Sequence, residues 1–143
     1  MTAWVIDSSV AVKWFLPPVH EQLVAEAQDL LRRYENGELQ FLVPDVFWAE
    51  SGNIFWKAVR SLRCSREDAE RSLSLLKSGR LLTVPSFALL NVAFEIAADF
   101  DRSFYDSLYV ALAVESQTRL VTADEKLVNA VAGHLPVTWL GAL

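Results

Sequence analysis

Residues 3–10 have the sequence AWVIDSSV, in which a short apolar run ends at a carboxylate and two hydroxyls. The run from Ala3 to Asp7 has the length and composition of a buried strand. The apolar residues that follow, up to Phe15, predict a short helix. A buried strand that leads directly into a helix is typical of α/β proteins with a parallel sheet. This stretch therefore predicts the first strand–helix unit of such a fold.

The same alternation continues along the chain. Short apolar runs predict further strands at residues 41–44, 81–84 and 119–122, with a weak last strand in PVTWL, residues 136–140. Amphipathic segments predict helices at residues 21–34, 46–62, 66–78, 86–98, 103–116 and 124–132. The predicted helix caps are Asp45, Ser65, Ser86 and Ser103. The pattern predicts an α/β fold with a mainly parallel sheet of four to five strands flanked by helices.

Composition favours a globular protein, with 52% hydrophobic and 22% charged residues. We expect residues 1–143 to form a single domain, since this length is enough for a hydrophobic core. The single cysteine, Cys64, excludes an internal disulfide and fits a reducing compartment. The start of the chain has no signal-peptide pattern, and the longest apolar region is too interrupted to cross a membrane. We therefore expect a cytoplasmic protein.

Charge leaves the class of partner open. The net charge of −5 argues against nucleic acid. Six basic residues nevertheless fall within residues 60–80, namely Arg60, Arg63, Arg66, Arg71, Lys77 and Arg80. They would form either a basic wall beside an acidic pocket or the solvated surface of a helical hairpin.

Four acids stand where an apolar strand or amphipathic helix meets a polar edge: Asp7, Glu50, Asp106 and Asp124. A carboxylate near apolar surface is costly unless it is paired or binds a cation. Ligands of open parallel sheets bind outside the carboxyl ends of the strands, near the point where strand order reverses. Because two of these acids follow predicted strands, we expect the four to meet at that edge. Their mutual repulsion would then require a divalent metal.

Each acid also has a structural explanation. Asp124 taken alone is better explained as a helix cap, whereas Asp7 is not, because Ser8 and Ser9 already supply capping oxygens. Glu50 lies at the border of the apolar arc of its helix, so it either turns inward or stays exposed near Lys57. Asp106 lies three residues after a serine and is equally compatible with a capping box. The set of four on one rim favours a shared site.

The segments that carry these acids resemble a known family. VIDSSV near the start, a Glu followed by Asn three residues later, YDSLYVALA and LVTADEKL are similar to PIN-domain ribonucleases, and most similar to VapC-type toxins of toxin–antitoxin pairs. The resemblance covers essentially the whole chain. It implies a PIN-like three-layer α/β/α fold and an endoribonuclease that depends on Mg²⁺ or Mn²⁺ and cleaves RNA by in-line attack of a metal-activated water.

The resemblance also implies roles for individual residues. The acidic quartet that binds metal and catalyses cleavage would be Asp7, Glu50, Asp106 and Asp124. Ser9 and Thr122 match small hydroxyl positions near the metal. Asp101 lies close before Asp106, so an exchange of roles between these two acids stays open.

The resemblance implies partners as well: an RNA substrate, a small antitoxin protein that occludes the acidic pocket, and a second copy of the chain. Trp14, Trp48 and Trp56 lie on amphipathic helices and serve either core packing or an exposed patch for such a partner. We expect no catalytic role for His20 or His134, which are isolated.

Other functions are also considered. A phosphotransfer enzyme of the haloacid-dehalogenase kind needs a second acid at the position of Ser9, which argues against it. A receiver-like phosphotransfer domain needs an acceptor Asp after a central strand, and Asp45 is a weak candidate. A non-catalytic PIN-like binding module is the remaining alternative, although acids at all four positions argue against loss of the site.

Overall fold

The computed structural model describes residues 2–131 and 133–143, and within them five strands form one parallel sheet. The strands are β1 (Thr2–Ile6), β2 (Leu39–Pro44), β3 (Leu82–Val84), β4 (Leu120–Thr122) and β5 (Val137–Trp139). Their order in the sheet is β3-β2-β1-β4-β5, and every neighbouring pair is parallel. The predicted class, a parallel sheet of four to five strands flanked by helices, is confirmed.

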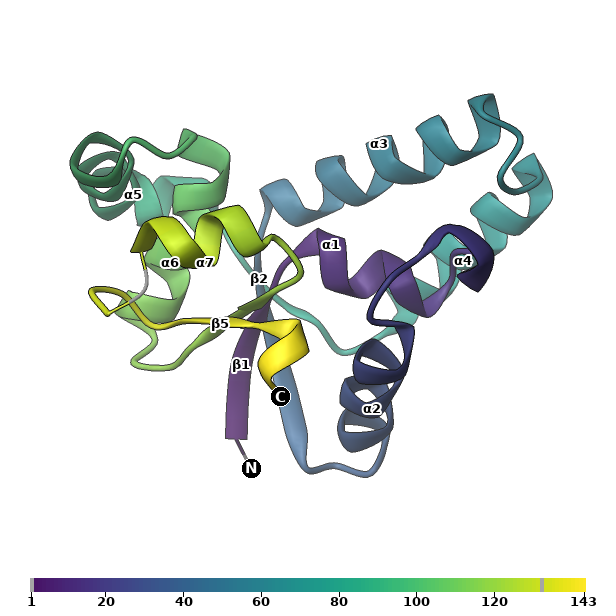
Figure 1. Ribbon diagram of the computed structural model, residues 1–143, viewed down its shortest axis with the longest axis horizontal. Coiled ribbons are helices and arrows are strands. Elements are labelled where there is room, and N and C mark those ends of the chain that lie inside the picture. Colours follow the sequence, from purple (N-terminus) through teal and green to yellow (C-terminus); the bar gives the residue numbers. More distant parts are fainter. Residues whose placement is uncertain (1, 132) are drawn as a thin grey trace.

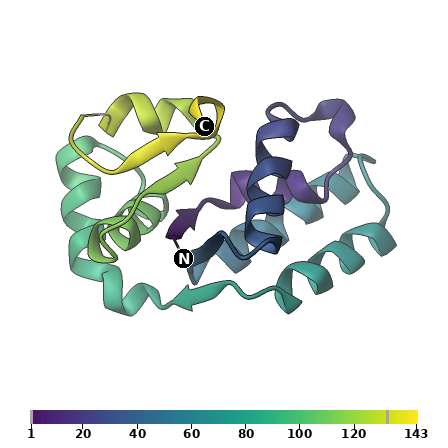
Figure 2. The same ribbon diagram turned by 90° about the horizontal axis from the view of Figure 1, so that it is seen from below.

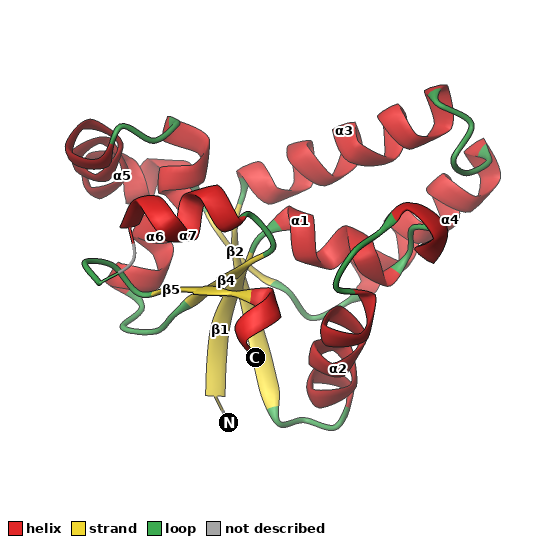
Figure 3. Ribbon diagram, viewed as in Figure 1, coloured by secondary structure: helices red, strands yellow, loops and turns green. Residues whose placement is uncertain are grey.

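Helices cover both faces of this sheet. They are α1 (Ser8–Ala11), α2 (Val24–Glu35), α3 (Val46–Arg60), α4 (Arg66–Ser78), α5 (Ser86–Phe100), α6 (Phe104–Glu115) and α7 (Glu125–Val131). Short 3-10 turns occupy Val12–Trp14, Pro18–His20 and Leu140–Ala142. In Figures 1 and 3, α5, α6 and α7 lie on one side of the strands and α1 to α4 on the other, and Figure 2 shows the same division from below.

This division follows from the strand order. The connections that run from β1 to β2 and on to β3 move one way along the sheet, and those from β3 to β4 and on to β5 move the other way. Because crossovers between parallel strands are right-handed, the two directions place their helices on opposite faces. The order of strands reverses between β1 and β4, so a ligand site is expected at the carboxyl ends of these two strands.

The main core lies around β1 and α6. Val5 and Ile6 of β1 are fully buried, and α6 is buried from Ser107 to Ala113. This helix contacts β1, β2 and β4 on one side, while α5 packs along its other side. The near-continuous apolar composition of α6 is therefore explained by its position between the sheet and α5.

A second, smaller core stabilises the hairpin formed by α3 and α4. Its buried residues are Val12, Leu16, Phe55, Ala58 and Ala69. The hairpin extends away from the sheet, as Figure 1 shows, with its turn at the far end from the strands. Glu50 lies on the sheet-proximal half of α3, so the sheet and the hairpin both influence its position.

Two features of the helix starts differ from the prediction. Helix α2 begins at Val24 rather than Glu21, because Leu23 has a left-handed backbone with φ 58° and interrupts the helical path. Asp45 holds the N-cap position of α3 as predicted, but its side chain makes no capping hydrogen bond there. The cap predicted from Ser86 is wrong. Ser86 is the first residue of α5, and its amide (3.1 Å) and hydroxyl both donate to the Asp45 carboxylate, which ties α5 to the start of α3. This pairing gives Asp45 a structural role and weakens the receiver alternative.

The caps predicted from Ser65 and Ser103 are confirmed, since their hydroxyls accept hydrogen bonds of 3.0 Å from the amides of Asp68 and Asp106. The predicted end of the last helix at Ala132 and the side chain of His20 lie outside what the structure describes. His134 is exposed.

The tryptophans divide between packing and exposure. The indole of Trp14 donates to the Ala27 carbonyl at 2.8 Å and stacks on Phe41, which is a packing role. Trp48 donates to the Thr83 hydroxyl at 3.0 Å. Trp56 is exposed, with a guanidinium over its ring. Packing is therefore confirmed for Trp14, and exposure applies to Trp56.

The basic residues near the α3–α4 turn fit a solvated hairpin better than a basic wall. Three of them are paired with acids: Arg63 with Glu21, Arg66 with Glu70 and Arg71 with Asp68. Such pairing leaves less positive charge available for nucleic acid. Within the described residues, no helix combines the length and apolar composition needed to cross a bilayer.

Candidate functional site

Asp7 lies at the carboxyl end of β1, next to the reversal of strand order, and only 8% of its surface is exposed. Its Oδ1 accepts hydrogen bonds of 3.3 Å from the Ser9 amide and the Ser8 hydroxyl. Its Oδ2 accepts a 2.7 Å bond from the Thr122 hydroxyl. Asp7 is thus itself the cap of α1, and the expectation that the two serines would replace it in this role is wrong. The same hydrogen bonds also fix the carboxylate at the sheet edge.

The end of β4 supplies the next part of the site. The Thr122 hydroxyl donates to Asp7 and accepts the Asp124 amide at 3.0 Å, so it links the two acids. Asp124 Oδ1 accepts the amides of Lys126 (3.0 Å) and Leu127 (3.2 Å), which confirms that it caps α7. The Ser9 hydroxyl accepts the amide of the residue before Asp124 at 3.2 Å, which holds this loop against α1.

Glu50 turns inward from α3. Its Oε1 accepts a 2.6 Å hydrogen bond from the Tyr109 hydroxyl and a 3.4 Å bond from the Ser8 hydroxyl. Ser8 donates to Asp7 as well, so one hydroxyl lies between two carboxylates. The inward orientation, rather than an exposed position near Lys57, is therefore what the structure shows for this glutamate.

Asp106 lies in the first turn of α6, where the positive end of the helix dipole favours a carboxylate. It is half-buried, whereas Asp101 is exposed and ends α5 in a left-handed conformation with φ 53°. Burial raises the pKa of Asp106, and the negative charges of Asp7 and Asp124 raise it further. Asp106, and not Asp101, therefore lies in the field of the other acids.

The electrostatics show that the four acids share one region. Burial raises the pKa of Asp7, partly offset by the hydrogen bonds from Thr122, Ser9 and Ser8. Burial also raises the pKa of Glu50, and the charges of Asp7 and Asp106 raise it further, against the hydrogen bond from Tyr109. For Asp106, burial is again the main cause, followed by the charges of Asp7 and Asp124. A cation at this edge would relieve the repulsion.

The donor atoms at this edge are carboxylate and hydroxyl oxygens, the ligands of hard cations such as Mg²⁺ and Mn²⁺. Within residues 2–131 and 133–143, no three acidic, histidine or cysteine side chains meet closely enough to coordinate one ion directly. This spacing still fits Mg²⁺, because that ion keeps several waters and takes only one or two carboxylates directly. The residues present are therefore compatible with an ion that some of the acids bind through water.

Two members of the site were not predicted from the sequence. Tyr109 is almost fully buried, and its pKa is raised strongly by burial and by the charges of Asp7 and Glu50. The sequence contained a signal for Tyr109, because a residue three positions after Asp106 on a helix lies on the same side as Asp106. A tyrosine buried there needs a hydrogen-bond partner for its hydroxyl, and the acidic site could supply one. Ser8 was considered only as a helix cap, although it contacts both Asp7 and Glu50.

The fold and the site define a class of parallel α/β proteins with a carboxylate-lined site at the reversal of strand order. The sequence profile of the PIN domain matches residues 4–133, and the chain therefore belongs to the PIN-domain family. This match confirms the resemblance found in the sequence. No curated protein sequence matches the chain at a significant level.

Solved structures with the same fold include the PAE2754 protein of Pyrobaculum aerophilum, with TM-score 0.68 and 23% identity over 99% of this chain and 92% of that one. A toxin–antitoxin complex of Klebsiella pneumoniae has TM-score 0.64 and 16% identity over 94% of each chain. Mycobacterium tuberculosis VapC20, a Sarcin-Ricin loop cleaving toxin, has TM-score 0.65 and 13% identity over 92% of this chain and 95% of that one. At these identities the likeness is one of fold.

Proposed function

We propose that this PIN-domain protein is an endoribonuclease that depends on Mg²⁺ or Mn²⁺ and acts as the toxin of a toxin–antitoxin pair. The observation that supports this most is the shared electrostatic field of Asp7, Glu50 and Asp106, each of which has a raised pKa. Acids that destabilise one another at a ligand-binding edge of the sheet are typical of functional sites.

The proposed roles follow from the hydrogen bonds. Asp7, held on both oxygens, would be the central ligand, with Asp106 sharing the ion. Glu50 and Asp124 would hold it directly or through waters. A bound divalent ion would supply Lewis acidity, which lowers the pKa of water and neutralises charge that develops on the phosphate. Ser9 and Thr122 position the β1 and β4 ends around it.

Glu50 is the proposed general base. Tyr109 and Ser8 both occupy Oε1, which fixes the carboxylate and directs the proton-accepting role to Oε2. The raised pKa of Glu50 brings its proton affinity closer to neutral pH, where a general base is more effective. The carboxylate would take the proton of a water that attacks phosphorus in line with the leaving oxygen.

The proposed substrate is single-stranded or looped RNA, whose phosphates and bases are accessible to a site at a sheet edge. One structure similar in fold is that of a Sarcin-Ricin loop cleaving toxin, and another is a toxin–antitoxin complex, which supports an RNA substrate and an antitoxin partner. We also propose a cytoplasmic location, where such an RNA and an antitoxin are available.

The test is cleavage of a labelled stem-loop RNA by the purified chain with Mn²⁺, with Mg²⁺ and with a chelator. Asp7→Asn should reduce metal-dependent cleavage by at least ~1,000-fold while the circular dichroism spectrum stays unchanged. Asp101→Asn is the matched control, because this exposed acid precedes the same helix and should retain full activity. Undiminished cleavage by Asp7→Asn would refute the proposal. Binding of RNA without cleavage by the unmodified chain would instead indicate a non-catalytic module.

A further inference from the structure

The outward face of α3 carries an aromatic ring between basic side chains. Trp56 is 58% exposed, and Lys57 and Arg60 are exposed as well. The Arg60 guanidinium lies 5.8 Å from the centroid of the Trp56 ring, within the range of a cation–π contact. The buried residues of α3, which include Phe55 and Ala58, lie on the other side of the helix. Packing therefore does not account for a tryptophan at this position.

These side chains continue outward from the acidic site. Residues at spacings of three and four follow one stripe along α3, in the order Glu50, Asn53, Lys57 and Arg60. Trp56 lies three residues after Asn53 and four before Arg60, so it borders the same stripe. With a rise of about 1.5 Å per residue, Trp56 is ~9 Å and Arg60 ~15 Å beyond Glu50 along the helix. We call Asn53, Trp56, Lys57 and Arg60 the α3 track.

The track has a local positive charge although the chain is acidic. Residues 51–66 include four basic side chains and no acid. Arg63 and Arg66 are paired with acids, whereas Lys57 and Arg60 make no ion pair with any residue that the structure describes. Lys57 and Arg60 also line, together with Ser61, an open hollow of about 260 Å³. Two cations without partners beside an open hollow are suited to a phosphate.

We propose that the α3 track binds the single-stranded RNA that continues from the cleavage site. An unpaired base would stack on Trp56, and phosphates of the same strand would contact Lys57 and Arg60. Single strands are commonly bound in this way, with bases on aromatic rings and the backbone along basic side chains. The inference rests on the proposed nuclease function, because it takes the acidic site as the point where the strand is cut.

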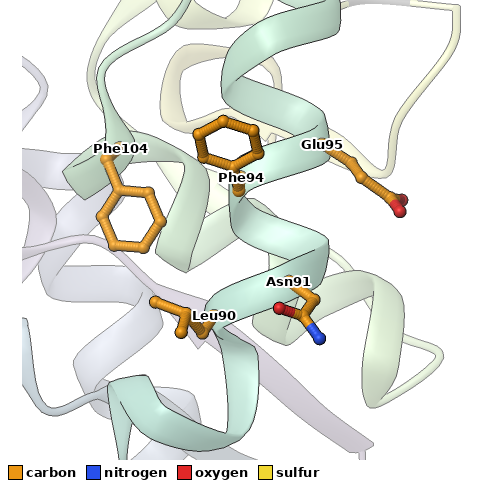
Figure 4. A pocket seen from close by; sticks show the side chains of 5 residues that line it. All are labelled: Leu90, Asn91, Phe94, Glu95 and Phe104. Atoms are coloured by element: carbon orange, nitrogen blue, oxygen red, sulfur yellow. The ribbon is translucent and has the colours of Figure 1, made fainter.

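Two comparisons favour this surface. The helix dipole accounts for cations in the last turn of α3, but it does not account for the tryptophan beside them. The exposed aromatic surface of α5 fits RNA less well. Figure 4 shows Phe94 and Phe104 at a pocket where the described lining residues include Glu95 and no basic side chain. A phosphate backbone would be repelled by that acid, whereas the α3 track would attract it.

Fluorescence anisotropy of a labelled single-stranded RNA with the full chain tests the role of Trp56. A chelator prevents metal-dependent cleavage, so binding is measured on its own. Trp56→Ala should raise the dissociation constant about tenfold, because the stacking of one base is lost. Trp56→Phe keeps an aromatic ring and should recover most of the affinity. Leu75→Ala is the matched control, because it removes an apolar side chain of similar exposure (54%) from α4 of the same hairpin and should not change binding.

The salt dependence of binding tests the basic residues. Lys57→Ala combined with Arg60→Ala should reduce the slope of log affinity against log salt by about 1.4, since each phosphate contact contributes about 0.7 in a single strand. Lys77→Ala combined with Arg80→Ala is the matched control, because these exposed residues have the same spacing at the end of α4. In Mn²⁺, the track variants should raise KM and leave kcat nearly unchanged.

Thermal unfolding should be the same for all of these variants, because every substituted side chain is exposed. Unchanged dissociation constants for Trp56→Ala and for the double variant of the track would overturn the inference, even if the unmodified chain cleaves RNA in Mn²⁺. Equal affinity for an RNA duplex and for the single strand would overturn it as well, because paired bases cannot stack on Trp56. Loss of affinity in the track variants, without cleavage by the unmodified chain, would support the track and refute the nuclease proposal.

Discussion

The Tyr109 hydroxyl donates a 2.6 Å hydrogen bond to Glu50 Oε1, which joins the buried helix α6 to the start of the α3–α4 hairpin. Ser8 extends this link by donating to both Glu50 and Asp7, and Thr122 donates to the second oxygen of Asp7. One polar network thus connects α6, α3, α1 and β4. Buried networks of this kind hold their members in one arrangement when every group is satisfied.

Removing the hydroxyl of Tyr109 should impair function more than stability. Tyr109→Phe leaves the ring packed but removes the bond that orients Glu50, so we expect cleavage to fall about tenfold and unfolding free energy to fall by about 1 kcal/mol. The Mn²⁺ concentration for half-maximal activity should rise. Tyr105→Phe, an exposed tyrosine of the same helix, is the control and should change neither quantity. Equal activity of both variants would exclude a positioning role for Tyr109.

The hydroxyl of Thr122 should matter for the same reason. Thr122→Val keeps the shape of this buried side chain but removes the donor to Asp7 and the acceptor for the Asp124 amide. We expect a loss of about 1–3 kcal/mol of stability and a weaker affinity for Mn²⁺ in calorimetric titration. Thr122→Ser, which restores the hydroxyl, should recover most of both. Failure of serine to rescue the variant would show that packing, rather than hydrogen bonding, explains the loss.

The raised pKa of Asp7 predicts how stability depends on pH. Its folded-state pKa lies above the ordinary value of 3.8, so the folded chain binds more protons than the unfolded chain in the interval between the two values. Proton binding therefore stabilises the folded chain at low pH. The free energy of unfolding falls as pH rises through that interval, and the ionised Asp7 stays destabilising above it. Asp7→Asn should remove this part of the pH dependence and raise stability at pH 7 in the presence of a chelator.

Urea unfolding at several pH values, with chelator and with Mn²⁺, checks this prediction. Because the acids are ionised at high pH, Mn²⁺ should stabilise the unmodified chain more at pH 7.5 than at pH 5. The same ion should stabilise Asp7→Asn much less at both values. A stabilisation by Mn²⁺ that is independent of pH and of this substitution would place the ion elsewhere.

Glu21 has the opposite effect on the way stability depends on pH. Burial alone would raise its pKa, but hydrogen bonds and charges from Arg63 and Lys13 outweigh burial and lower it. Its stabilising effect is therefore complete above the ordinary pKa of 4.5 and is lost as pH falls below it. Glu21→Ala should cost about 2–3 kcal/mol at pH 7, because it leaves Lys13 buried without its partner.

The exposed pair of Glu70 and Arg66 provides the control for this prediction. Glu70→Ala should change the free energy of unfolding by less than about 0.5 kcal/mol, since water already screens that pair. Chemical unfolding of the two variants at pH 7 and pH 4 makes the comparison. A similar loss from both substitutions would show that burial does not distinguish the two pairs.

The sequence predicted the fold class because strands such as β1 and helices such as α6 have apolar patterns of different period and length. It did not predict the order of strands, which depends on contacts between distant segments. The start of α2 was missed because the left-handed backbone at Leu23 has no signal in residue type. The side chain of Asp45 accepts hydrogen bonds from Ser86 instead of capping α3, which the sequence did not predict because the start of α5 lies close to Asp45 only in the folded chain.

The acids of the candidate site were predictable because each interrupts an apolar pattern, as Asp7 does after β1. Tyr109 was not, because an aromatic ring continues the apolar pattern of α6 and conceals the polar end of the side chain. Burial and hydrogen-bond partners, which only the fold supplies, identify it as part of the site.

The separate small core under the α3–α4 hairpin divides the chain into two regions of unequal local stability. Opening of the far end of the hairpin breaks the contacts around Phe55 and Ala58 and the ion pair of Arg63 with Glu21, whereas the main core around β1 stays packed. Amide protons in the second half of α3 should therefore exchange with solvent sooner than those of β1. Motion of the α3–α4 hairpin is transmitted to the acidic site through α3, which carries Glu50. A partner that binds the hairpin and restricts its motion would therefore also reduce the motion of the acidic side chains.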